Sequence, residues 1–201
     1  DSGDPVAVSG NVESFMERPH LIIKKINRAS VQYYGRYGYD PSLIVPSSKR
    51  NASDMWKSIV KVIKSINSNH IRRLVSMIYK ENKETLMTHP ATVNSHYNYR
   101  SGLIEHILSM VKIAEQLIKH YKVDRDLLLA GILLHDIGRL FEISSDLESK
   151  YTDEGKFLGR IILGRDMIRT TAEKIKNFPN QVQIKIEHII IAEQGKYEWD
   201  N

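Results

Sequence analysis

The sequence predicts a mainly α-helical protein, in which an all-α helical bundle is preceded by a partial β segment. Apolar residues alternate with polar ones over residues 6–15 and again over 20–28, which is typical of two half-buried strands. Gly10 interrupts the first stretch at a position that favours a bulge or bend. From Asn51 onward the apolar residues recur every three or four positions, as they do in amphipathic helices.

The two strands form a predicted hairpin, joined by the turn residues Met16–Pro19. A two-stranded sheet is only marginally stable in water, so we expect further strands to come from elsewhere. Residues 31–50 follow as an irregular linker with four tyrosines among glycines and prolines. The linker side chains that could stack on bases or touch phosphates are Tyr33, Tyr37, Lys49 and Arg50. They could equally pin the linker to a domain surface.

The helical part divides at residues that favour helix caps or break helices. Ser53 and Thr152 are candidate caps, and Pro179 separates the last two helices. We expect helices that start near residue 51, near Ile71, at Ser101 (ending at Tyr121), at Asp124 or Asp126 (ending at His135-Asp136), at Thr152 (ending near Lys176) and at Asn180 (ending at Gln194).

Composition excludes several classes of protein. The 201 residues can form one or two domains, and no apolar run approaches the roughly 18 residues of a membrane span. No signal peptide is visible, and the chain has no cysteine, which excludes disulfides and thiolate metal sites. We expect a cytoplasmic protein with no membrane partner. The chain opens without Met, which is consistent with a fragment of a longer protein.

The formal net charge is +5, and the excess of Lys and Arg lies within residues 1–90. A basic first half that faces a polyanion such as nucleic acid is one interpretation. Ordinary surface lysines on a soluble protein are the other.

The His135-Asp136 pair ends an apolar stretch, Leu127–Leu134, and is the most informative feature of the chain. Burying two such groups is costly unless something pairs with them. The pair could be a polar helix end that reaches water, or half of a metal site. Histidines on neighbouring helices could complete such a site, and nitrogen and oxygen ligands without sulfur favour Mn, Fe, Co, Ni or Zn. The candidates are His96, His106 and His188.

Four segments together resemble a known family. Residues 94–106 resemble the HHxYxGGLLEHT signature of HD-domain proteins, and residues 129–138 resemble their LLAGALLHDIGK run. Residues 151–159 are similar to their YTDEGxLLG stretch. Residues 45–56 look like the VPSSKRD linker that joins an OB-fold to an HD domain. The order and spread of these motifs resemble the YhaM-type bacterial 3′→5′ exoribonucleases.

The resemblance implies three regions: the last strands of an OB-fold over 1–30, a linker over 31–50 and an HD domain over 51–201. It also implies a metal-dependent phosphodiesterase core that acts on single-stranded RNA or DNA in a homo-oligomer, with Mn the first choice of metal. By motif, His106, His135, Asp136 and His188 are the implied metal ligands. Asp136 and His96 are the implied catalytic residues. The implied nucleic-acid contacts are Lys24, Lys25, Tyr33, Tyr37, Lys49 and Arg50.

The chain departs from the family pattern where a second metal position is expected. Arg160, Glu193 and Gln194 replace family histidines, and Tyr97 replaces the second His of HHxY. Glu193 could still supply an oxygen ligand. The late aspartate of the family's ligand set would lie beyond Gly195, so we expect the domain to continue past the end of this sequence.

Three functions are consistent with these residues. The first is a metal-dependent 3′→5′ exonuclease or related phosphodiesterase. The second is an HD fold that has lost turnover and serves as a nucleic-acid-binding or scaffold protein. The third is an HD phosphohydrolase that acts on a free nucleotide.

Overall fold

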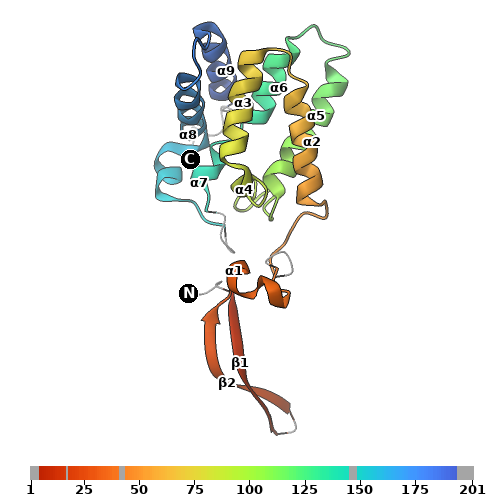
Figure 1. The fold of residues 1–201 in the computed structure, drawn as a ribbon, viewed down its shortest axis with the longest axis vertical. Coiled ribbons are helices and arrows are strands. Elements are labelled where there is room, and N and C mark those ends of the chain that lie inside the picture. Colours follow the sequence, from red (N-terminus) through yellow and green to blue (C-terminus); the bar gives the residue numbers. More distant parts are fainter. Residues whose placement is uncertain (1–4, 17, 41–43, 145–148, 194–201) are drawn as a thin grey trace. The chain divides into compact units, whose positions relative to one another are not determined.

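The computed structural model describes residues 5–16, 18–40, 44–144 and 149–193, and the chain forms two units, residues 1–46 and 47–201. The first unit contains strands β1 (Val6–Phe15) and β2 (Arg18–Arg28), helix α1 (Val31–Tyr34) and the 3₁₀ turn η1 (Gly35–Tyr37) (Figure 1). The strands pair in an antiparallel hairpin, as predicted. The prediction of an irregular segment from residue 31 was wrong for 31–37, which form these two short helical turns.

The hairpin register shifts between Ser9 and Gly10, which confirms the predicted bulge. A Cβ on Gly10 would lie 2.0 Å from the carbonyl oxygen of Ile22, so only glycine allows this close approach of the two strands. Apolar side chains are exposed along both strands, and Val12 is 71% exposed. Neighbouring residues such as Leu21 and Ile22 point to opposite faces, so both faces of the sheet are apolar and uncovered by the described residues.

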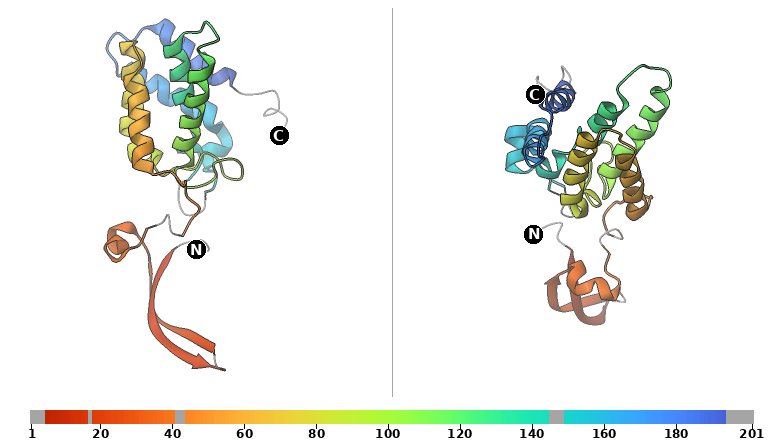
Figure 2. Two further views of the ribbon diagram at one scale, coloured as in Figure 1. Left: turned by 90° about the vertical axis from the view of Figure 1, so that its right-hand side faces the viewer. Right: turned by 45° about the horizontal axis from the view of Figure 1, so that its top comes forward.

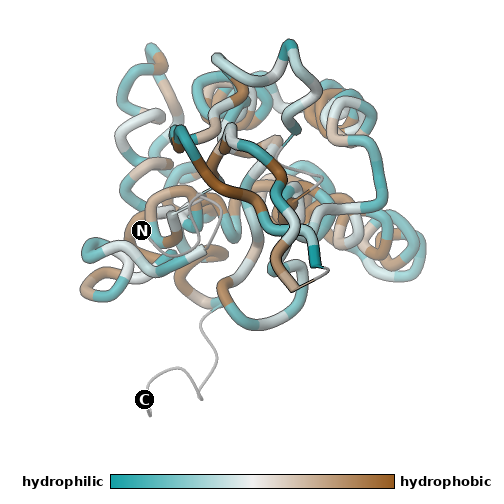
Figure 3. The backbone as a smooth tube through the Cα atoms, turned by 90° about the horizontal axis from the view of Figure 1, so that it is seen from below, coloured by the Kyte–Doolittle hydropathy of each residue, from teal (hydrophilic) through white to brown (hydrophobic). Residues whose placement is uncertain are grey.

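In the described residues of the second unit the regular secondary structure is helical, apart from two isolated bridges. Its helices are α2 (Ala52–Lys64), α3 (Asn69–Glu81), α4 (Lys83–Leu86), α5 (Gly102–Leu117), α6 (Arg125–Leu134), α7 (Arg139–Glu142), α8 (Asp153–Glu173) and α9 (Asn180–Ala192). Helices α2, α3, α5 and α6 lie side by side, while α8 contacts α3 and α9 contacts α6 (Figures 1 and 2). In Figure 3 hydrophobic and hydrophilic segments alternate along the helices, as expected of helices with one buried face.

One hydrophobic core runs through the second unit. Its fully buried residues come from every long helix of the bundle, among them Ile59, Leu74, Leu103, Leu133, Ile168 and Ile186. Asp124 caps α6 and Thr152 caps α8, as expected. The first bundle helix is capped by Asn51 instead of the predicted Ser53. No helix in the described parts of the chain is both long and apolar enough to cross a membrane.

Two glycines bring α7 and α8 together. A Cβ on Gly138 would lie 1.9 Å from the carbonyl oxygen of Arg160, so the turn after α6 packs directly on the backbone of α8. Gly138 itself has an ordinary helical φ of −64°, so close packing explains this glycine better than a left-handed helix ending would. Gly159 has φ +67° and interrupts α8, which re-aims the backbone just before Arg160.

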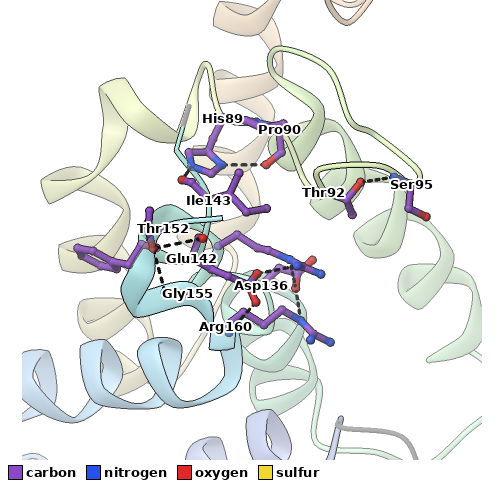
Figure 4. Close-up of polar contacts among 12 residues, drawn as sticks. His89, Pro90, Thr92, Ser95, Asp136, Glu142, Ile143, Thr152, Gly155 and Arg160 are labelled. Atoms are coloured by element: carbon purple, nitrogen blue, oxygen red, sulfur yellow. Dashed lines mark hydrogen bonds and ion pairs between the residues drawn. The ribbon is translucent and has the colours of Figure 1, made fainter. Parts of the chain in front are cut away.

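His89 is fully buried and ties the segment before α5 to the segment after α7. Its Nδ1 lies 2.8 Å from the carbonyl oxygen of Pro90 and its Nε2 lies 3.0 Å from that of Ile143 (Figure 4). Burial lowers the pKa of His89 below its usual 6.5, and the nearby Arg139 charge lowers it further. The hydrogen bonds with the two carbonyl groups oppose this shift. The folded protein therefore resists protonation of this ring.

We expect the free energy of unfolding to fall as the pH drops below about 6.5, because the unfolded chain then takes up a proton at His89 before the folded protein does. His89→Gln removes the titration and should flatten this slope, while it lowers stability at neutral pH by about 1–3 kcal/mol. Urea unfolding across the pH range measures both effects. His120→Gln, at an exposed histidine, is the control, and equal slopes in the two variants would contradict the prediction.

Candidate metal centre

Helix α6 delivers His135 and Asp136 to the interior of the bundle. Both side chains are about 6% exposed, because the apolar run that precedes them is buried against α3, α5 and α9. The Tyr79 hydroxyl on α3 donates to the carbonyl oxygen of Leu133 at 2.6 Å. This bond satisfies a carbonyl in the last turn of α6 and fixes the turn that carries the pair.

His106 on α5 meets this pair. Its Nε2 lies 3.1 Å from His135 Nε2 and 3.8 Å from Asp136 Oδ2, and the latter two atoms are 3.5 Å apart. Two ligands at ~2.1 Å from one ion lie about 3.0–3.4 Å apart, in octahedral or tetrahedral geometry. The three atoms therefore have nearly the spacing of ligands to one divalent cation, and they are the one such cluster among the described residues.

Hydrogen bonding and burial prepare both imidazoles to bind a cation. His135 Nδ1 lies 2.8 Å from the carbonyl oxygen of Ile132, which assigns the proton to Nδ1 and leaves a lone pair on Nε2. Burial lowers the pKa of His106, with a further contribution from His135, so this ring is neutral at neutral pH. The Tyr97 ring packs on His106 with centroids 5.2 Å apart and holds its orientation. This donor set fits a divalent metal ion.

Two arginines face the other oxygen of Asp136. Arg160 Nε donates to Asp136 Oδ1 at 2.9 Å, and Arg139 Nε lies 3.4 Å from the same atom (Figure 4). Glu142 links the two arginines, because its carboxylate accepts from Arg139 Nη1 at 2.6 Å and from the Arg160 backbone N–H at 3.0 Å. Glu193 Oε1 lies 3.5 Å from Arg160 Nη2. Asp136 thus divides the site into a histidine side and an arginine side.

These groups line an open cavity of about 340 Å³. Its wall includes His96, Tyr97, His106, His135, Asp136, Arg139, Arg160 and Glu193. Burial raises the pKa of Glu193, with Asp136 adding to the rise and His135 and Arg160 opposing it. His96 is exposed and lines the wall without joining the ligand cluster.

His188, a predicted ligand, does not join the ligand cluster among the described residues. Its side chain is exposed on α9 and is absent from the lining of the cavity, among the residues described. Successive residues on a helix point about 100° apart. Ile189 and Glu193, four residues apart, face the site instead, and Ile189 packs over Gly131. The helical period therefore places Glu193, the predicted substitute ligand, at the cavity in preference to His188.

Sequence reasoning missed Arg139 and Glu142. Arg139 stands where the family motif HDIGK has its lysine, three residues after Asp136. Opposite charges at this helical spacing could have indicated that the two side chains form an ion pair. Glu142 follows three residues later, at the same spacing. Together they support Asp136 from a single short helix.

The predicted nucleic-acid contacts are all exposed, and they are divided between the two units. Tyr33 and Tyr37 line a hollow of about 500 Å³ in the first unit with Asn27, Arg28, Tyr34 and Arg36. Arg36 lies over the Tyr37 ring, 4.7 Å from its centroid. In the second unit Arg50 lines a hollow with Lys61, Lys112 and Arg125. Lys24, Lys25 and Lys49 are exposed.

Comparison with known proteins agrees with this geometry. Residues 103–200 match the family model of the HD domain. The chain is 32% identical over 195 residues to the 3′-5′ exoribonuclease YhaM of Shouchella clausii. It is 36% identical over 199 residues to that of Oceanobacillus iheyensis and 31% identical over 195 residues to that of Bacillus subtilis.

These alignments cover 96% of the chain but 60% of each relative, so the chain spans less than two thirds of the relatives' length. No solved structure gives a significant match. The ligand cluster of His106, His135 and Asp136 lies within the matched residues. Residues 103–200, which carry this cluster, are therefore similar to the HD domain.

Proposed function

We propose that this chain is part of a metal-dependent 3′→5′ exoribonuclease that acts on single-stranded RNA. The observation that carries the proposal is the cluster of His106, His135 and Asp136, spaced for one divalent cation in the wall of an open cavity. The relatives are named 3′-5′ exoribonucleases, which supports RNA as the substrate. Mn²⁺ is the proposed metal, and a nitrogen and oxygen ligand set also suits Fe, Co, Ni or Zn.

A cation bound there would acidify a water molecule and neutralise charge on a phosphate. In the proposed hydrolysis the water oxygen bonds to phosphorus, and the bond from phosphorus to the 3′ oxygen of the preceding nucleotide breaks. That 3′ oxygen takes a proton, and the last nucleotide leaves as a 5′-monophosphate. His106 and His135 act as neutral ligands, Asp136 supplies the negative charge, and His96 at the cavity wall is the proposed proton donor or phosphate contact.

We also propose that residues 1–30 are the last strands of an OB-fold that delivers single strands to this site. The exposed apolar residues on both faces of the hairpin support this proposal, because an OB-fold would cover one of them. The Tyr33 and Tyr37 hollow, with Arg28 and Arg36 beside it, offers the aromatic and basic groups that bind bases and phosphates. A homo-oligomer is expected from the resemblance, and a cytoplasmic location is expected from the composition.

The test uses single-stranded RNA labelled at its 5′ end, incubated with the protein and Mn²⁺. We expect a ladder of products that shortens from the 3′ end, no products with a chelator, and no products with His106→Ala. His120→Ala, at an exposed histidine outside the site, should cleave like the unmodified protein.

Two other outcomes would replace the proposal. Salt-sensitive RNA binding without shortening would favour the scaffold function. The observation that favours this alternative is the contact of Arg160 with Asp136, because a positive charge beside a metal ligand opposes the binding of a cation. Hydrolysis of free nucleotides but not of RNA would favour a nucleotide phosphohydrolase.

A further inference from the structure

The arginine side of the site has the features of a built cationic position. Arg160 approaches Asp136 Oδ1 at 2.9 Å, while the histidines approach Oδ2, so the carboxylate lies between a guanidinium and the proposed cation position. Arg160 stands where the resemblance of residues 151–159 to the family motif implies a histidine of a second metal position. Its side chain is 13% exposed and lines the cavity.

The backbone holds this guanidinium in place. Gly159, with φ +67°, turns the Arg160 N–H toward Glu142 Oε1, and the Arg160 carbonyl lies against Gly138. Arg139 adds a second guanidinium on the same side, and its buried Nε has no hydrogen-bond partner among the described residues. The same Nε lies 3.4 Å from Asp136 Oδ1, so this guanidinium adds its charge to the side of the carboxylate that Arg160 contacts.

We propose that Arg160, backed by Arg139, supplies the second positive charge of this centre in place of a second metal ion and binds the substrate phosphate opposite the single bound cation. This inference rests on the proposed function. Arginine keeps its charge at any working pH and matches two phosphate oxygens with its planar fork. A metal ion at Oδ1 would have to displace a guanidinium that is already within hydrogen-bond distance.

The first test counts Mn²⁺ ions per chain by elemental analysis after equilibration with Mn²⁺ alone. We expect one ion in the unmodified protein and two in Arg160→His, where the new imidazole would join Glu193 and Asp136 Oδ1. Arg165→His is the matched control, since Arg165 lies on the same helix and pairs with Asp166 outside the cavity, and it should bind one ion. Two ions in the unmodified protein, or one in Arg160→His, would overturn the proposal.

The second test measures the affinity for adenosine 5′-monophosphate by calorimetry in the presence of Mn²⁺. Arg160→Met keeps the length of the side chain without its charge, and we expect the Kd to rise by ~10–100-fold. The Kd for the first Mn²⁺ should not rise, because the histidine side is intact and the substitution removes a positive charge beside Asp136. An unchanged Kd for the nucleotide would overturn the proposal.

These outcomes separate the two proposals. RNA shortening by a protein that binds two Mn²⁺ ions would keep the exoribonuclease function and overturn the role of Arg160. One bound ion and Arg160-dependent nucleotide binding, without RNA shortening, would do the reverse.

Discussion

Asp136→Asn should abolish stable Mn²⁺ binding and RNA cleavage while the helical unit stays folded. The substitution removes the only negative charge in the ligand cluster and leaves two guanidinium groups beside the two imidazoles. A cation at this position would then meet repulsion without compensation. We expect the affinity for Mn²⁺ and the cleavage rate each to fall by at least ~10³-fold, since losing several kcal/mol of charge stabilisation has that effect.

The fold should survive because asparagine has the same size and its amide oxygen can still accept from Arg160 Nε. Thermal unfolding followed by circular dichroism tests this, and we expect the free energy of unfolding to fall by about 1–3 kcal/mol. Asp153→Asn, at an exposed carboxylate paired with Lys156, is the control and should match the unmodified protein. Retention of Mn²⁺ binding by Asp136→Asn would refute the assignment of the metal centre.

Gly138→Ala should destabilise the second unit and displace Arg160. The new Cβ would lie 1.9 Å from the Arg160 carbonyl oxygen and 2.6 Å from the Gly164 nitrogen, and both are backbone atoms that cannot turn aside. Helix α8 would have to move away from α7, which would break the Arg160 contact with Asp136 Oδ1. We expect the free energy of unfolding, measured in urea, to fall by about 2–4 kcal/mol, which is at the upper end of the cost of overpacking.

Gly131→Ala is the matched control, because its Cβ would meet only side-chain atoms of Ile189, the nearest at 2.8 Å. That side chain can adopt another rotamer, so we expect the free energy of unfolding to fall by less than about 1.5 kcal/mol. Equal losses in the two variants would show that backbone contact between α7 and α8 is not the reason for Gly138.

Most of the helical unit could be predicted because its helices have strong local signals. The apolar period, the caps Asp124 and Thr152, and the breaker Pro179 are all properties of short stretches of sequence. Val31–Tyr34 was missed because its four residues carry no helix signal stronger than the surrounding glycines and prolines.

The candidate site could be predicted only in part. His106, His135 and Asp136 were accessible through motifs that match over many positions. His188 was a candidate from its place on a neighbouring helix and from the motif, while the helical period of α9 turns Glu193 to the cavity. The arginine side depends on the interruption at Gly159 and the contact at Gly138, and such tertiary contacts leave no periodic trace in the sequence.

The uncovered hairpin has a practical consequence for any solution study of this chain. Within the described residues each strand pairs only with the other, so an outer row of backbone N–H and C=O groups runs along both sides of an apolar ribbon. Such edges can pair with the same edge of another molecule and produce dimers or larger aggregates that have no biological meaning. Charged substitutions at Val12 and Ile22, which leave the helical unit untouched, would separate this artefact from genuine assembly before any oligomeric state is assigned.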